Sequence, residues 1–258
     1  MIVRDFIDKL NSVAPFELAE SWDNPGLMTG SLDLNINKVA VCLDAVEEAV
    51  IKASENGCEV LLCHHPVIFR AIKKIDFETE QGRVLKAAIK NDIAVIAAHT
   101  NWDIVNGGVN TELAKLIDLK DVKALDAETG LGAAGVLSEA VSCEEFLNRV
   151  KAAWGLSWID YYRANNNKIK RVALCGGSGA EFWPLAKNFG ADIYLTADMK
   201  YHELIDAVKA GVNIALMEHG EMEQASLPEL VNKLKAVCGD EIEFCLLDVK
   251  ALVKRESF

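Results

Sequence analysis

The sequence predicts an α/β fold in which two similar α/β halves, built from duplicated βαβ-type units with mixed sheets, face a shared cavity. Short apolar runs alternate with helical patterns, which indicates parallel βαβ units. The second part of the chain matches the first at a fixed offset, and histidines and carboxylates follow the apolar runs. The length of 258 residues suits one large or two modest domains. We expect halves at residues 1–124 and 125–258.

The first half holds three strand-like runs separated by two helical patterns. In open α/β sheets, ligands bind beyond the carboxyl ends of the strands. Three of the five histidines, His64, His65 and His99, stand at two such ends. In chain order, the predicted elements are a strand at residues 39–43, a helix at 46–55, a strand at 60–63, a helix near 81–90 and a strand at 93–98.

The second half repeats this arrangement. Residues 39–65 align without a gap to residues 172–198, an offset of 133, with seven identities in 27 positions. We interpret the match as a duplication, although βαβ units in general resemble one another. In both halves the next strand ends in a histidine that a carboxylate follows four residues later: His99 with Asp103, and His219 with Glu223.

Two further segments complete the predicted fold. An amphipathic helix at residues 143–154 and a strand at 157–163 fit a covering helix and an edge strand. The glycine-rich run 176–179 follows a strand and precedes a helix, so its backbone N–H groups are candidates for a phosphate cradle. No Gly-Lys-Ser/Thr completes a phosphate-binding loop, and a tight strand-to-helix turn explains the run equally well.

Composition and charge narrow the classes of function. Lys and Arg number 27 against 39 Asp and Glu, a net charge of −12, which argues against broad electrostatic capture of nucleic acid or of an anionic membrane. No run of about 18 apolar residues occurs, and the N-terminus lacks a signal-peptide core, so we expect a cytoplasmic protein. The seven cysteines form no CxxC motif and are expected to be reduced, mostly in the core.

The adjacent His64 and His65 follow an apolar run and precede Pro66. Just past a strand end, both imidazoles can project toward one cavity, and neutral imidazole is the commonest metal ligand in proteins. Histidines with carboxylates form a mixed ligand set that suits Zn²⁺, Fe²⁺, Mn²⁺, Co²⁺ or Ni²⁺. A carboxylate can bridge two cations, which makes a dinuclear centre attractive. The candidate ligands are His64, His65, Asp103, His219 and Glu223, with His99 nearby.

Each candidate ligand also has a simpler explanation. The histidine pair can serve packing or hydrogen bonding at a strand end. His219 and Glu223 can form an i,i+4 helical pair worth only ~0.2–0.5 kcal/mol, and Asp103 can be a turn or capping residue. Metal binding is favoured because the candidate ligands occur together: each falls just past a predicted strand, at the same sheet edge, in two similar halves.

Four motifs stand at intervals along the chain, Trp22-Asp23-Asn24-Pro25-Gly26-Leu27, Cys63-His64-His65-Pro66-Val67-Ile68-Phe69, His99-Thr100-Asn101-Trp102-Asp103 and Thr196-Ala197-Asp198-Met199-Lys200-Tyr201-His202. Together with a weaker fifth stretch, residues 219–223, they resemble the YbgI-like dinuclear metal centre proteins, also named GTP cyclohydrolase 1 type 2 homologues. The resemblance covers essentially the whole chain and points to the short form of the family, without the central inserted domain.

The resemblance implies a metal site and an assembly. Two divalent metal ions per subunit would be held by His64, His65, Asp103, His219 and Glu223, with Glu223 as the bridge. The subunits would form a homohexamer, a toroid built as a trimer of dimers.

The resemblance also implies substrate-binding and catalytic roles. Lys200, Tyr201 and His202 would line the mouth of the cavity, and His99 would act as a proton shuttle. The chain departs from the family pattern at Glu218 and Met222, which stand where the family usually has glycine and Ser or Thr. This departure puts the local geometry and charge of the last motif in question.

The leading functional hypothesis is a metal-dependent hydrolase that acts on a small-molecule substrate with metal-activated water. The alternative is a non-enzymatic metal-binding, assembly or regulatory protein that acts through its oligomeric ring. A nucleic-acid-binding toroid is disfavoured by the net charge. Hydrolysis of GTP rests on the family name alone, because nothing in the sequence identifies a guanine-binding site.

Overall fold

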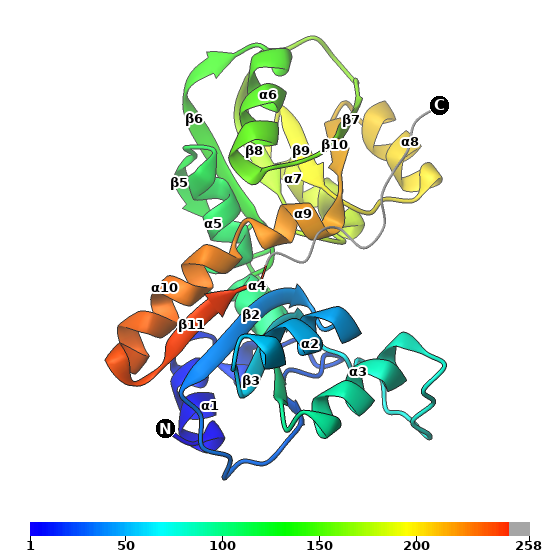
Figure 1. Cartoon of the computed structure of the whole chain (residues 1–258). Helices are drawn as coiled ribbons and strands as arrows, with labels where there is room; N and C mark the ends of the chain where they lie inside the picture. Colours follow the sequence, from blue (N-terminus) through cyan, green and yellow to red (C-terminus); the bar gives the residue numbers. More distant parts are fainter. Residues whose placement is uncertain (248–258) are drawn as a thin grey trace. The chain divides into compact units, whose positions relative to one another are not determined.

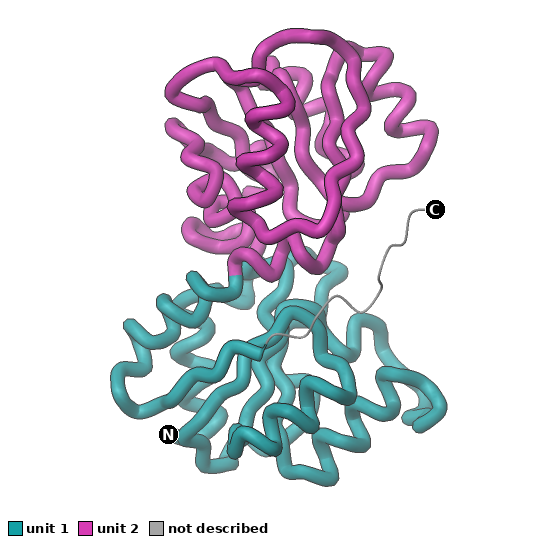
Figure 2. The backbone as a smooth tube through the Cα atoms, turned by 45° about the horizontal axis from the view of Figure 1, so that its top comes forward, with its two compact units in different colours: residues 1–102, 227–258 teal, residues 103–226 magenta. Residues whose placement is uncertain are grey.

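The chain leaves its first sheet after about residue 102, builds a second sheet, and returns to the first near its end (Figures 1 and 2). The computed structural model describes residues 1–247. Of the described residues, the first compact unit comprises 1–102 and 227–247, and the second comprises 103–226. These units do not coincide with residues 1–124 and 125–258, because helix α10 (Leu227–Cys238) and strand β11 (Glu243–Leu246) belong to the first unit.

The first unit contains a five-stranded mixed sheet in the order β1-β4-β3-β2-β11. Strands β2, β3, β4 and β11 are parallel along this order, and β1 pairs antiparallel with β4. The predicted strands and helices of the first half are confirmed here. Their observed bounds are β1 Gly26–Thr29, β2 Lys38–Asp44, α2 Glu47–Glu55, β3 Val60–His65, α3 Glu80–Lys90 and β4 Ala94–Ala97, after α1 Val3–Val13.

Both faces of this sheet are buried, which is why its central strands read as continuous apolar runs. Cys245 of β11 packs in a cluster with side chains of α2 and α3. Its neighbour Phe244 points to the opposite face and contacts Phe6 of α1, with ring centroids 6.3 Å apart. Helix α10 packs beside α1 and contacts β2 and β11.

The second unit contains a six-stranded mixed sheet in the order β5-β6-β8-β9-β10-β7. Strands β8, β9 and β10 are parallel, while β7, β6 and β5 pair antiparallel with their neighbours. The predicted strand at 157–163 is β7, and it is an edge strand as expected. The bounds are α5 Val109–Leu116, β5 Lys120–Lys123, β6 Ala133–Val141, α6 Cys143–Trp154, β7 Ile159–Tyr162, β8 Ile169–Leu174, α7 Trp183–Phe189, β9 Ile193–Thr196, α8 Tyr201–Lys209, β10 Asn213–Met217 and α9 His219–Gln224. The short helix α4, Thr100–Ile104, begins in the first unit and ends in the second.

The two units share one topology. In each, an antiparallel strand precedes three parallel strands joined by helical connections, and it pairs with the last of the three: β1 with β4, and β7 with β10. The offset of 133 aligns β2 with β8 and β3 with β9. The prediction of two similar α/β halves with mixed sheets is therefore confirmed.

The helices follow from local signals in the sequence. Helix α6 begins after Ser142, whose side chain accepts a hydrogen bond from the Glu145 N–H, and ends at Gly155, which has φ +68°. These are the expected N-cap and left-handed C-cap residues. Along the described part of the chain, no helix is both long and apolar enough to cross a membrane.

Candidate metal centre

Three imidazoles of the first unit gather at the carboxyl ends of β3 and β4. The ring centroids of His64 and His65 lie 4.9 Å apart, and His99 lies 5.2 Å from His64 and 5.5 Å from His65. One nitrogen from each ring lies within 4.8 Å of the others, so this group could hold a metal ion. The parallel pairing of β3 with β4 brings the histidines together, because parallel strands end at the same edge of a sheet.

The histidine pair lies within the last two positions of β3, where the sequence had suggested a place just past the strand. The two rings are held by different neighbours. The Nδ1–H of His64 donates to the Ala98 carbonyl oxygen after β4, and the Nδ1–H of His65 donates to Asp44 Oδ1 at the end of β2, both at 2.8 Å. Each side of β3 therefore orients one ring.

Four histidines share this anchoring through Nδ1. A carbonyl or carboxylate oxygen can only accept, so the partner fixes the proton of the neutral ring on Nδ1 and leaves the lone pair on Nε2. Metal-binding histidines show the same arrangement, in which an oxygen orients the ring and sets its tautomer. The pairs are His64 with Ala98, His65 with Asp44, His99 with Asp23 and His219 with Asp198, at 2.7–2.8 Å.

Asp23 is a residue that the sequence analysis quoted only as part of a motif. Its side chain is fully buried. Oδ1 accepts from His99 Nδ1, and Oδ2 accepts from the Thr100 N–H at 3.0 Å and the Thr100 hydroxyl at 2.5 Å. Burial opposes ionisation, yet these hydrogen bonds lower the pKa of Asp23 to about 2. An ionised carboxylate thus holds His99.

Asp44 was missed and Asp198 was quoted only as part of a motif, although both had a signal in the sequence. Asp44 directly follows the apolar run of β2 and pairs in register with His65. Asp198 is the residue that the offset of 133 aligns with His65. The rule that singled out the histidines, a polar side chain just past a strand, applies equally to these aspartates. Asp23 offered no such signal, because it is 76 residues from His99 along the chain.

His219 and Glu223 form one turn of α9 in the second unit. His219 Nε2 lies 3.1 Å from Glu223 Oε2, and Nδ1 lies 2.7 Å from Asp198 Oδ2. Asp198 Oδ2 also accepts from the Ser178 hydroxyl at 2.7 Å. Burial alone would lower the pKa of His219, but the two carboxylates raise it to about 11. The metal-free ring is therefore protonated on both nitrogens, and Nε2 of His219 can bind a metal ion only after losing its proton.

The glycine-rich run 176–179 is a tight turn next to this pair. Gly177 has φ +63°, and a Cβ there would lie 2.2 Å from Glu223 Oε1 and 2.9 Å from His219 Nε2. The Gly176 N–H donates to Asn110 Oδ1, and the Gly179 N–H donates to Thr196 Oγ1. Internal acceptors use two of these N–H groups and a carboxylate lies alongside, which favours the turn explanation over a phosphate cradle.

Asp103 lies in the second unit, near the end of α4. Its carbonyl oxygen accepts from Asn110 Nδ2 at 3.1 Å. Burial raises the pKa of the Cys175 thiol, and the negative charges of Asp103, Glu181 and Glu223 raise it further. A carboxylate oxygen of Asp103 lies within 4.8 Å of one of Glu223, so both carboxylates are directed into one region of this unit.

The two departures from the family pattern leave α9 intact. Glu218 is the N-cap of α9, and its side chain accepts from the Glu221 N–H at 2.5 Å. Glu221 accepts from the backbone N–H and the hydroxyl of Ser157, and Met222 is fully buried. The two additional carboxylates therefore have structural partners in the second unit.

Lys200, Tyr201 and His202 form the exposed start of α8. The Lys200 N–H donates to Glu203 Oε2 at 2.9 Å, which closes a capping interaction. Tyr201 is 72% exposed, and its ring lies 5.4 Å from that of His202. Their role in substrate binding stays a prediction.

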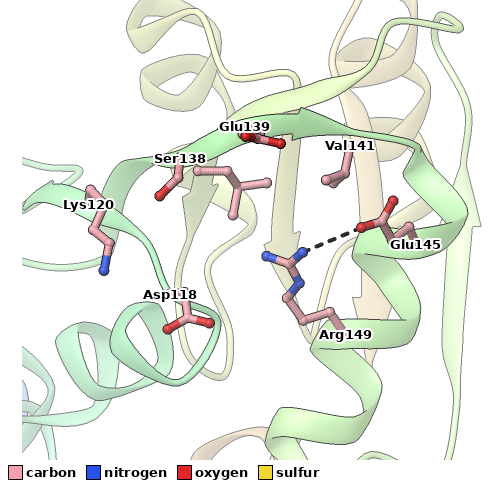
Figure 3. A pocket seen from close by; sticks show the side chains of 8 residues that line it. Asp118, Lys120, Ser138, Glu139, Val141, Glu145 and Arg149 are labelled. Atoms are coloured by element: carbon pink, nitrogen blue, oxygen red, sulfur yellow. Dashed lines mark ion pairs between the residues drawn. The ribbon is translucent and has the colours of Figure 1, made fainter.

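A separate cavity of about 450 Å³ lies in the second unit, by β5, β6 and α6 (Figure 3). Figure 3 shows Arg149 beside Glu145, an ion pair of 3.6 Å. None of the predicted site residues lines this cavity. The lining residues are Asp118, Lys120, Leu137, Ser138, Glu139, Val141, Glu145 and Arg149.

Comparisons with known proteins agree with the resemblance carried by the motifs. Residues 1–251 match the family model described as Duf34/NIF3 (NGG1p interacting factor 3). A GTP cyclohydrolase 1 type 2 homolog of Clostridium perfringens is 36% identical over 249 residues, which are 95% of each chain. The crystal structure of Staphylococcus aureus protein SA1388 is similar with a TM-score of 0.91 and 27% identity, covering 100% of this chain and 99% of that one. A protein named ybgI gives 0.88 at 19% identity over 98% and 100%, a likeness of fold alone.

Proposed function

Since the chain belongs to the Duf34/NIF3 (NGG1p interacting factor 3) family, we propose that it binds two divalent metal ions and uses metal-activated water to hydrolyse a small-molecule substrate. The observation that carries the proposal is the shared anchoring of four histidines, each with Nδ1 bound to an oxygen. Oriented imidazoles of this tautomer, accompanied by carboxylates, fit a divalent cation of the zinc, iron or manganese type.

The proposed ligands come from both units. His64 and His65 supply Nε2 from the first unit, and the second supplies the carboxylates of Asp103 and Glu223 with Nε2 of His219. We propose Glu223 as the bridging ligand. When bound, the ions would supply water of lowered pKa and stabilise negative charge on the substrate.

His99 is the proposed general acid and base. Its Nδ1–H donates to the buried carboxylate of Asp23 at 2.7 Å, which fixes the ring and stabilises the imidazolium that forms when Nε2 takes a proton. A histidine oriented by an aspartate is a common proton-transfer group in hydrolases. Lys200, Tyr201 and His202 are proposed to contact the substrate.

One observation favours a second function. The nitrogens of His64, His65 and His99 lie within 4.8 Å of one another and could together hold one ion. If His99 is a ligand, it is not available for proton transfer, which favours a non-enzymatic metal-binding or assembly protein. In both cases we propose a cytoplasmic protein that forms a homohexamer. Light scattering of the purified protein tests the hexamer directly.

Metal analysis combined with turnover assays tests the proposal. Purified protein is analysed for bound metal and then assayed on nucleotides, phosphodiesters and peptides. We expect two ions per subunit and turnover on one class, with both lost in His65→Ala and Glu223→Gln. Glu144→Gln, an exposed change on α6, is the control and keeps both. Bound metal without turnover on any class would favour the non-enzymatic function, and metal content unaffected by either substitution would contradict the ligand set.

A further inference from the structure

Two large aromatic side chains stand exposed beside His99 in the first unit. Trp22 is 56% exposed and Phe69 is 40% exposed. Their ring centroids lie 5.7 Å apart, and the His99 ring lies 6.2 Å from Trp22 and 6.0 Å from Phe69. His99 itself has a side-chain exposure of only 15%. The imidazole thus lies at the base of a small aromatic patch.

Polar contacts on either side hold these aromatic residues in place. Next to Trp22, Asp23 is bound to His99 and Thr100. The side chain of Asn24 donates to the Ile68 carbonyl oxygen at 2.5 Å, which ties the loop of Trp22 to the loop of Phe69.

A second tie fixes the Phe69 loop to the body of the unit. Gln81 of α3 donates from Nε2 to the Val67 carbonyl oxygen at 2.6 Å. Hydrogen bonds therefore fix both loops that carry the two rings, so the rings are held in their exposed positions. Scattered exposed apolar residues need no explanation, whereas contiguous exposed apolar side chains bordered by polar groups are typical of interaction sites.

From this geometry we propose that Trp22 and Phe69 form a stacking subsite for a planar heteroaromatic ring of the ligand. The faces of such a ring are apolar and stack on aromatic side chains. Its edge carries nitrogen or oxygen atoms that can hydrogen-bond to Nε2 of His99. The subsite rests on the proposed function, because it names the class of substrate that His99 would meet.

The imidazole at the base of the patch argues against a purely apolar occupant. An apolar surface of a second copy of the chain would cover His99 Nε2 without offering it a hydrogen bond, and burying a polar group in this way costs free energy. A heteroaromatic ring covers Trp22 and Phe69 and can satisfy the imidazole with its edge. Because the patch combines two aromatic rings with a polar imidazole, it fits a heteroaromatic ligand better than a purely apolar one.

Binding of nucleosides to the full-length protein tests the subsite without requiring turnover. Adenosine and guanosine are the probes, and ribose is the ring-free control. Dissociation constants are measured by ligand-observed NMR, in which stacking also shifts the base protons upfield. The variants are Trp22→Leu and Phe69→Leu, with Trp22→Phe as the variant that keeps a ring. Leu18→Ala is the matched control, since Leu18 is another exposed apolar residue of this unit, 42% exposed.

We expect a nucleoside to bind more tightly than ribose, with a dissociation constant raised about tenfold or more in Trp22→Leu and Phe69→Leu. Trp22→Phe and Leu18→Ala should bind within about threefold of wild type. Metal content, measured in the same samples, should be unchanged in all four variants, so failure of the metal site and failure of the subsite are distinguishable.

Three results would overturn the subsite. The first is nucleoside binding no tighter than ribose. The second is equal binding by wild type and Trp22→Leu. The third is a change of oligomeric state in Trp22→Leu without any change in nucleoside binding, because the patch would then be a self-association surface.

Discussion

Asp44 and His65 occupy paired positions at the ends of adjacent parallel strands, and the carboxylate accepts a hydrogen bond from the imidazole Nδ1 at 2.8 Å. The strand register itself therefore creates the carboxylate–histidine pair. A similar hydrogen bond joins Asp198 and His219, which lie beyond the ends of β9 and β10 and are not paired in register. In both units, an aspartate after one parallel strand orients a histidine at the end of the next.

Removing this carboxylate should weaken metal binding while leaving every ligand in place. We expect Asp44→Ala to reduce the metal affinity of the protein about 10–100-fold, because His65 loses both its orientation and its added basicity. Asp44→Asn keeps an acceptor oxygen and should lose less. Competition with a chromophoric chelator measures the affinities. Equal affinities in wild type and Asp44→Ala would show that His65 is not a ligand.

Gly177 and Gly155 provide a matched pair for testing how closely the backbone of Gly177 approaches Glu223 in the candidate metal centre. Both have positive φ, +63° and +68°, but only at Gly177 would a Cβ collide, 2.2 Å from Glu223 Oε1, whereas nothing lies within 4 Å at Gly155. Gly155→Ala should cost about 1–2 kcal/mol of unfolding free energy from backbone strain alone.

Gly177→Ala combines that strain with the collision and should cost about 2–4 kcal/mol, and it should also lower metal content. Urea unfolding and metal analysis of both variants measure the difference. If the two variants are equally stable and bind equal metal, Glu223 does not lie where the structure puts it.

The carboxylate of Asp23 should make stability depend on pH in the acid range. Its pKa falls from 3.8 to about 2 on folding, although burial opposes the change, because His99 and Thr100 donate to it. Because the pKa of Asp23 is lower in the folded than in the unfolded protein, its ionisation stabilises the fold above the unfolded pKa. This contribution to the free energy of unfolding is present above about pH 4 and is lost as the pH falls toward 2.

A shift of this size corresponds to about 2 kcal/mol. The free energy of unfolding should therefore fall more steeply between pH 4 and pH 2 in wild type than in Asp23→Asn, as measured by urea titration at each pH. Parallel curves for the two proteins would mean that the Asp23–His99 pair does not form.

The cysteines should divide into two reactivity classes. Burial raises the pKa of Cys63 to about 12 and that of Cys42 well above its ordinary value, and thiolate is the reactive form. Cys143 and Cys245 are only partly buried. Iodoacetamide at pH 8 should label these two in the folded protein and reach Cys42 and Cys63 only after denaturation. Mass spectrometry of peptides checks this, and rapid labelling of Cys63 would contradict its burial.

Local residue patterns predict most helices and strands of this fold. Pairing between strands that are far apart in the sequence accounts for what was not predicted. Helix α6 was predicted from its amphipathic pattern, and the parallel strands from short apolar runs. The return of α10 and β11 to the first unit was not predicted, because β11 pairs with β2 about 200 residues earlier, and loop closure over such a distance leaves no local signal.

The candidate site divides in the same way. The histidines at strand ends were visible in the sequence because parallel strands end at one edge of a sheet. The pairing of Asp23 with His99 and the close approach of Gly177 to Glu223 depend on loop conformations, so only the structure shows them.

Anomalous diffraction from crystals of the metal-loaded protein tests the central claim most directly. Data recorded above and below the absorption edge of the bound metal locate the ions and identify their ligands. We predict two anomalous peaks per subunit, coordinated by Nε2 of His64, His65 and His219 and by the carboxylates of Asp103 and Glu223. Absence of anomalous signal at these side chains, or coordination that leaves them out, would contradict the account.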